Sequence, residues 1–112
     1  MPLLPNYENA AVPDAKVRDF LLYLEHPDND RRAILFYALG YKREEWQRLA
    51  DDLLQHALTE DAIEIPSPYG RRFRIVAMLK GPSGSRPLRS IWEIPHGADA
   101  AAFVTAYPRR RL

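Results

Sequence analysis

The side chains that could do chemistry in this sequence are mostly arginines, and they cluster in its second half. Arg71, Arg72 and Arg74 follow one another closely, and beyond position 68 the only acidic residues are Glu93 and Asp99. The whole chain has a formal net charge of +1, so this excess of positive charge is local. Such a cluster favours an anionic partner such as phosphate, and the competing interpretation is a solvated basic surface with a frayed tail.

Three histidines could transfer protons. His26 stands before a proline at a predicted helix end, where a capping or packing role is the alternative. His96 lies in the turn before the last predicted strand, and His56 falls inside a predicted helix, where it is expected at the surface. Because the three are dispersed and the chain has no cysteine, we predict neither a metal site nor a cofactor.

The length and composition predict one domain over residues 1–112, since the chain has 112 residues of which 46% are hydrophobic. The start of the chain has no basic segment followed by an apolar run, which a signal peptide would need. No stretch approaches the ~18 apolar residues of a membrane span. We therefore expect a cytoplasmic protein with no membrane partner.

The helical part is predicted to cover residues 13–58, after an extended arm at residues 1–12. Apolar residues recur with helical spacing in Asp14–Leu24, Asp30–Leu39 and Arg43–Leu58. Asp14 is expected to cap the first helix and Asn29 or Asp30 the second. Gly40 can end the second helix in a left-handed conformation.

After residue 60 the apolar period changes to two, which is typical of strands. The strands of an antiparallel sheet over residues 62–107 are predicted at Ala62–Ile65, Arg72–Lys80, Leu88–Ile94 and Ala102–Tyr107, before a basic tail at residues 108–112. This order predicts an α+β fold, with about three N-terminal helices packed on one face of about four antiparallel strands. The other face is then open, and we expect it to display Arg72 and Arg74, together with Arg89 and Thr105.

The chain resembles an uncharacterised bacterial family, domain of unknown function 6883, through short matches in the family's order along nearly its whole length. The matches are Leu4-Pro5-Asn6, Glu25-His26-Pro27, Arg32-Ala33, Phe36, Ala38-Leu39-Gly40-Tyr41, Trp46, Leu53-Leu54, His56-Ala57, Tyr69-Gly70-Arg71-Arg72-Phe73, Ile91-Trp92-Glu93-Ile94 and Val104-Thr105-Ala106-Tyr107-Pro108. The family has no established activity that could be carried over to this chain.

A more distant similarity is to the barnase/EndoU/colicin/RelE class of bacterial ribonuclease toxins, in which helices also precede a four-stranded antiparallel sheet. In such enzymes a general base activates the ribose 2′-hydroxyl, a cation stabilises the charged phosphorane and an acid protonates the leaving oxygen. The resemblance implies a toxin of a toxin–antitoxin-like pair, with RNA as substrate, no metal requirement and a small antitoxin-like partner protein.

One departure from the expected family pattern concerns the general base. Where the family is expected to show His-Lys-Ala at the start of the second helix, this chain has Arg31-Arg32-Ala33. Arginine cannot lose its proton in a protein, so Arg31 could only bind phosphate or stabilise charge. Either His26 or His96 takes the role of the base, or this member is a weak or inactive enzyme, or the family is not catalytic.

Two hypotheses follow. In the first, a metal-independent ribonuclease-like toxin, the candidate catalytic residues are His26, Arg31, Arg32, Arg72, His96 and Thr105, and the candidate substrate-binding residues are Tyr69, Arg71, Arg74, Trp92 and Tyr107. The aromatic residues would stack RNA bases, although Trp92 could instead pack in the core. In the second hypothesis the chain is a non-catalytic protein–protein interaction module, whose open sheet face binds a small partner protein.

Overall fold

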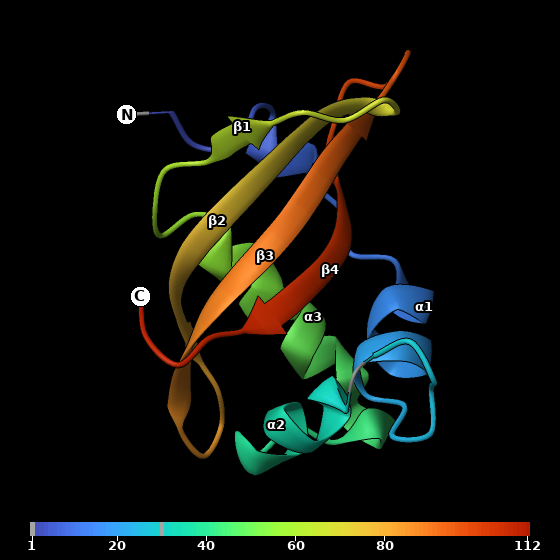
Figure 1. Ribbon diagram of the computed structural model, residues 1–112, viewed down its shortest axis with the longest axis vertical. Helices are drawn as coiled ribbons and strands as arrows, with labels where there is room; N and C mark the ends of the chain where they lie inside the picture. Colours follow the sequence, from blue (N-terminus) through green and yellow to red (C-terminus); the bar gives the residue numbers. More distant parts are fainter. Residues whose placement is uncertain (1, 30) are drawn as a thin grey trace.

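The computed structural model describes residues 2–29 and 31–112 and confirms the α+β class. Its sheet has four antiparallel strands in the order β1-β2-β3-β4, namely β1 (Ile63–Ile65), β2 (Gly70–Lys80), β3 (Ser85–Pro95) and β4 (Ala102–Pro108). Figure 1 shows the sheet in front, with α3 (Trp46–His56) behind it. None of the described helices is long and apolar enough to cross a membrane.

Alternation along the strands gives the sheet two different faces. In β2 the side chains of Phe73, Ile75, Ala77 and Leu79 are buried against the helices. The side chains between them point to the opposite face, which none of the described helices covers. β2 and β3 are paired along all eleven residues of each strand. β2 therefore begins two residues before its predicted start and ends at Lys80 as predicted, whereas β3 extends beyond its predicted bounds at both ends.

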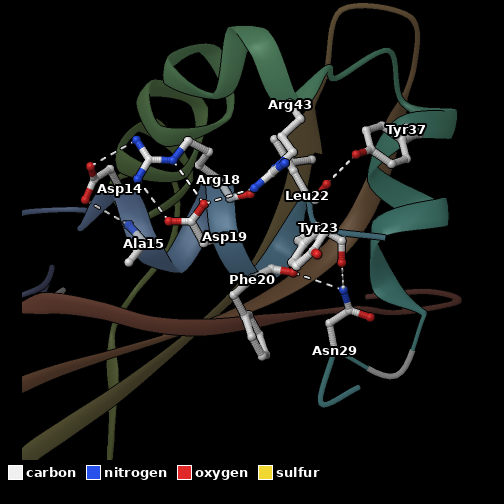
Figure 2. A network of polar contacts seen from close by, with 10 residues as sticks. All are labelled: Asp14, Ala15, Arg18, Asp19, Phe20, Leu22, Tyr23, Asn29, Tyr37 and Arg43. Atoms are coloured by element: carbon white, nitrogen blue, oxygen red, sulfur yellow. Dashed lines mark hydrogen bonds and ion pairs between the residues drawn. The ribbon is translucent and has the colours of Figure 1, made fainter. Parts of the chain in front are cut away.

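The first helix was expected to run unbroken from Asp14 to Leu24, and this is wrong. α1 (Asp14–Lys16) is followed by a π-helical segment, η2 (Val17–Leu21), in which the Leu22 N–H donates to the carbonyl of Val17 at 2.9 Å. Carbonyl groups at and just after the end of this turn accept hydrogen bonds from the side chain of Asn29. Its side-chain amide donates to the carbonyl oxygens of Phe20 at 3.0 Å and Tyr23 at 2.7 Å (Figure 2).

The second helix, α2 (Arg32–Ala38), starts later than predicted. Arg31 adopts a left-handed conformation with φ 63°, and its N–H donates to Asn29 Oδ1 at 2.9 Å. The alternative cap, Asp30, lies outside the described residues. At the other end Gly40 has φ 95°, as expected, and a Cβ there would meet Ser83 Oγ at 2.5 Å.

The N-terminal arm is not simply extended. It contains a short 3-10 helix, η1 (Tyr7–Asn9), and then pairs in parallel with the start of β4 through an Ala11–Ala102 bridge. Leu4 is buried in the core, so the arm covers part of the hydrophobic face. The third predicted helix begins as η3 (Arg43–Glu45) and continues as α3, and Leu49 and Leu53 of α3 are fully buried.

His56 was expected at the surface, and the structure corrects this, because its side chain is only 2% exposed. Its Nε2 lies 3.0 Å from the carbonyl oxygens of both Ala77 and Leu88, so Nε2 carries the hydrogen and donates it. Nδ1 therefore accepts from the Ser90 hydroxyl at 3.0 Å, and the Trp92 indole N–H donates to that hydroxyl at 2.9 Å. The ring thus ties α3 to β2 and β3 inside the core.

We predict that His56 makes the stability of the protein depend on pH. Burial lowers the pKa of its imidazole, against the opposing effect of the two carbonyls. The unfolded chain therefore binds a proton at this residue below about pH 6.5 while the folded chain does not. Above about pH 6.5, His56 should therefore add no pH dependence to the free energy of unfolding. Below that pH, the free energy of unfolding should decrease as the pH falls towards the lower folded-state pKa.

Urea denaturation of the wild type and of His56→Gln between pH 7.5 and 5 tests this. The variant should be less stable by about 1–3 kcal/mol at neutral pH, because it disturbs buried hydrogen bonds. Its stability should also decline less steeply with acid than that of the wild type. Equal pH slopes for the two proteins would contradict the assignment.

Candidate functional site

The uncovered face of the sheet brings together side chains from all four strands. The pairing of the strands sets Arg74 opposite Ile91 and Ile91 opposite Thr105, while the next row on this face sets Arg89 opposite Tyr107. These side chains line a concavity of about 280 Å³, and we call its lining the open face: Ile65, Arg72, Arg74, Arg89, Ile91, Val104, Thr105 and Tyr107.

Positive charge on the open face is only partly compensated. Arg72 Nε donates to Glu93 Oε1 at 3.0 Å, and the Ser67 hydroxyl donates to the same oxygen at 2.6 Å. Neither Arg74 nor Arg89 forms an ion pair with any of the described residues. The Nε of Arg89 is buried and has no hydrogen-bond partner there. Two guanidinium groups on this face are therefore available to an anion.

Arg32 approaches the same region from the helical side, and it is buried with only 7% exposure. Its Nη1 donates to Thr105 Oγ1 and to the carbonyl of Ala106, both at 2.8 Å. Its Nε donates to the carbonyl of Asn29 at 2.6 Å, and Nη2 donates to that of Asp28 at 3.1 Å. The acceptors of these hydrogen bonds are three backbone carbonyls and one hydroxyl, all uncharged. No carboxylate of the described residues forms an ion pair with the Arg32 guanidinium.

Aromatic rings complete the setting of Arg32. Its guanidinium carbon lies 5.0 Å from the ring centroid of Phe20 and 4.6 Å from that of Tyr107. The guanidinium carbon of Arg89 lies 4.9 Å from the same Tyr107 ring. Both guanidinium carbons are within 5 Å of the Tyr107 ring centroid, so they lie within about 10 Å of each other. The negative electrostatic potential of an aromatic ring face attracts cations at such distances. Tyr107 thus joins Arg32 to the open face.

His26 is linked to this cluster through the ring of Phe20. Its ring packs edge-on against Phe20 with 4.8 Å between centroids, and Phe20 in turn contacts Arg32. The Asp28 backbone N–H donates to His26 Nδ1 at 3.1 Å, so a neutral His26 carries its hydrogen on Nε2. The structure therefore brings Arg32, Thr105 and Tyr107 into direct contact, and it connects His26 to Arg32 through Phe20. Arg31 is exposed beside Arg32 at the start of α2.

Three of the predicted site residues lie elsewhere on the surface of the protein. His96 and Tyr69 are at the far end of the sheet, where the His96 N–H donates to the Tyr69 carbonyl at 3.1 Å. About seven strand residues separate His96 from Arg89, or roughly 23 Å along β3. Arg71 points to the opposite face from its neighbour Arg72, and it pairs with Glu64 at 3.0 Å. These positions do not contribute to the open face.

Trp92 had two interpretations, stacking on an RNA base or packing in the core, and the structure supports the second. The residue is fully buried, because it shares the core face of β3 with Leu88 and Ser90. Its ring packs edge-on against that of Phe103, with 5.4 Å between the centroids, and its indole N–H donates to the Ser90 hydroxyl. No face of this indole is available to a ligand.

The sequence analysis also missed part of the lining. Ile65, Ile91 and Val104 were not identified, although Ile65 and Ile91 follow from strand alternation once the strand pairing is known. Val104 joins the lining at a register shift, since Ile91 pairs with Thr105 whereas Trp92 pairs with Phe103. Such a bulge has no clear signal in one sequence. No group of three His, Asp or Glu in the described part of the chain could hold a metal ion.

Comparisons with known proteins give a family and a fold. A family model described as "Domain of unknown function (DUF6883)" matches residues 3–110. No curated protein shows significant sequence similarity. One similar solved structure is a chain of a "Contact-dependent growth inhibition toxin - immunity protein complex from Klebsiella pneumoniae 342", with a TM-score of 0.69, 19% identity, and coverage of 92% of this chain and 96% of that chain. At this identity the likeness establishes a shared fold alone.

The setting of Arg32 leads to a prediction about stability. Arg32→Lys keeps the charge, but an ammonium group has only three N–H donors and cannot bond the four oxygens that the guanidinium bonds, so buried carbonyls lose their donors. We expect the variant to lose about 2 kcal/mol of unfolding free energy. Arg31→Lys is the matched control on the neighbouring exposed residue, and it should change stability by less than about 0.5 kcal/mol. Equal effects of the two changes in urea denaturation would contradict the structural role of Arg32.

Proposed function

This chain belongs to the DUF6883 family, and we propose that it is a toxin-like domain that binds RNA on its open face and cleaves it without a metal ion. One observation carries the proposal. Arg74 and Arg89 lie in one concavity without a carboxylate partner among the described residues, and Arg89 shares the Tyr107 ring with Arg32. This arrangement suits an anion with several oxygens, such as a phosphodiester.

RNA fits the concavity better than an isolated phosphate would. The lining adds the apolar side chains of Ile65, Ile91 and Val104 to the arginines, so it can receive a ribose or base as well as the backbone. Proteins recognise RNA through contacts to phosphate and the 2′-hydroxyl together with apolar and aromatic surfaces. The guanidinium groups of Arg32 and Arg89 both lie against the ring of Tyr107. We therefore propose that Tyr107 positions these two cations and does not stack on a base.

The proposed reaction is attack of a ribose 2′-oxygen on the adjacent phosphorus. The phosphorus–5′-oxygen bond breaks, and the products are a 2′,3′-cyclic phosphate and a 5′-hydroxyl end. Arg74 and Arg89 bind non-bridging oxygens and stabilise the extra charge of the phosphorane. The Thr105 oxygen accepts from Arg32, so its own hydrogen can be donated to the phosphate. His26 accepts the proton of the 2′-hydroxyl as general base, since Arg31 cannot act as a base, and water protonates the leaving 5′-oxygen, so that the hydroxide formed then takes the proton from His26.

The fold neighbour supports the toxin-like part of the proposal. That chain belongs to a complex of a growth inhibition toxin and an immunity protein, and it has the same layout over almost its full length. We propose by analogy that this chain acts in the cytoplasm, where RNA is present, and has a small partner protein that restrains it. An excess of positive charge on the open face would favour an acidic partner.

A second candidate function is a non-catalytic interaction module. The observation that favours it is that none of the histidines lies in the lining of the open face, and Arg31 occupies the position where a base was expected. The face would then bind the acidic partner alone and leave RNA intact.

Removing Arg74 and Arg89, which form no ion pair with the described residues, should distinguish the RNA-cleaving function from the non-catalytic interaction module. We expect Arg74→Ala/Arg89→Ala to weaken binding of a single-stranded oligoribonucleotide at least tenfold. The slope of log affinity against log salt concentration should fall by roughly 1.4, the value for two lost phosphate contacts. Cleavage of the oligonucleotide, measured with a chelator present, should decrease in parallel. Fluorescence anisotropy and gel analysis provide the two readouts.

Arg71→Ala is the matched control, because it removes an arginine from the opposite face of the same strand. It should leave binding and cleavage within twofold of the wild type. Equal losses in the control would show that the total charge matters and not the open face. Binding without any cleavage in the wild type would favour the interaction module.

A further inference from the structure

The long central strand β2 has a free edge over half its length. β1 pairs with it only at Arg72, Phe73 and Arg74. From Ile75 to Lys80 no strand of the described chain pairs with β2 on the side away from β3. An unpaired edge of this kind presents a row of backbone donors and acceptors, to which another extended chain can add.

The strand pairing identifies which backbone groups point outwards. Met78 is opposite Pro87, and the carbonyl of Pro87 accepts the Arg109 N–H at 2.8 Å, so it points towards β4 and away from β2. In an antiparallel pair, the N–H and C=O groups of two directly opposed residues either all point towards the partner strand or all point away from it. The N–H and C=O of Met78 therefore point to the free edge, and by alternation so do those of Val76 and Lys80.

A groove runs along the same edge. It has a volume of about 310 Å³ and is lined by Met78 and Lys80 of β2 and by Asp52, Gln55, His56 and Thr59 at the C-terminal end of α3 and just beyond it. Because paired strands lie about 4.8 Å apart, a strand added to β2 would lie in this groove. Half of its side chains would point towards α3 and the other half towards the uncovered side of the sheet.

Charge indicates the kind of strand that fits. On the uncovered side the added strand would lie next to Arg74, Val76, Met78 and Lys80, and no described carboxylate pairs with either cation. Carboxylates at alternate positions would be favoured there. A second copy of this chain would instead bring its own Arg74 and Lys80 to the same side, where like charges repel.

We propose that β2 is a docking edge for an extended segment of an acidic partner protein, which adds as a strand along Ile75–Lys80. The added strand would place its carboxylates beside the open face and so oppose the binding of an anion there. The inference rests on the proposed partner and not on RNA cleavage. It specifies where that partner binds and what pattern its sequence has.

Amide hydrogen exchange measured by NMR on the full chain tests the proposal. In the free protein the amides of Val76, Met78 and Lys80 should exchange at least 100-fold faster than those of Ile75, Ala77 and Leu79. A short peptide of alternating glutamate and valine is then attached to the C-terminus through a flexible linker, which raises its local concentration. The tail leaves the sheet beside Pro87, close to Met78. The attached peptide should slow exchange at Val76 and Met78 more than tenfold.

Two controls define the edge. An alternating lysine and valine peptide should give no protection. Met78→Pro removes an N–H that pairs with no strand of the described chain, so it should keep the fold and abolish the protection of Val76 and Lys80, whereas Met78→Val should retain it. Protection by both peptides, protection confined to other strands, no protection at all, or a dimer of the free chain through β2 would overturn the proposal. None of these readouts involves RNA, so the cleavage proposal can fail independently.

Discussion

The buried guanidinium of Arg32 is the interaction on which the arrangement of this molecule depends. A cation with so little exposure is costly unless its donors are satisfied, and here four hydrogen bonds to oxygens and two aromatic rings provide for it. The partners come from the loop before α2, from η2 and from β4, so this one side chain fixes three parts of the chain against each other. The residue before it, Arg31, has a left-handed conformation, and its N–H donates to Asn29 Oδ1.

The same alternation that builds the core also builds the candidate site. Each long strand gives one row of side chains to the helices and the other row to the uncovered face. On the covered side His56 links α3 to β2 and β3, and on the uncovered side Arg74 and Arg89 have no carboxylate among the described residues. A rigid sheet therefore holds the cations without requiring a flexible loop. We regard this preorganisation as the physical basis of the proposed RNA binding.

The sequence allowed the fold class and much of the open face to be predicted, because both follow from a period of two. The same rule, applied fully, places Arg71 and Trp92 on the covered side. His56 is seven residues after Leu49 and three after Leu53, so the helical stripe already indicated its burial. The π-helical turn, the bulge at Val104 and the contact of Arg32 with Tyr107 could not be predicted. They depend on segments far apart in the sequence, whose pairing appears only in the folded chain.

Induced expression of this chain alone in a bacterial host, with growth and the chemistry of RNA ends recorded, tests the central claim most directly. The account predicts growth arrest and RNA fragments that carry 2′,3′-cyclic phosphate ends. Both effects should be relieved in Arg74→Ala/Arg89→Ala at equal levels of folded protein and retained in Arg71→Ala. Normal growth with intact RNA from well-expressed, folded wild-type protein would contradict the account. The open face would then be a surface for a protein partner.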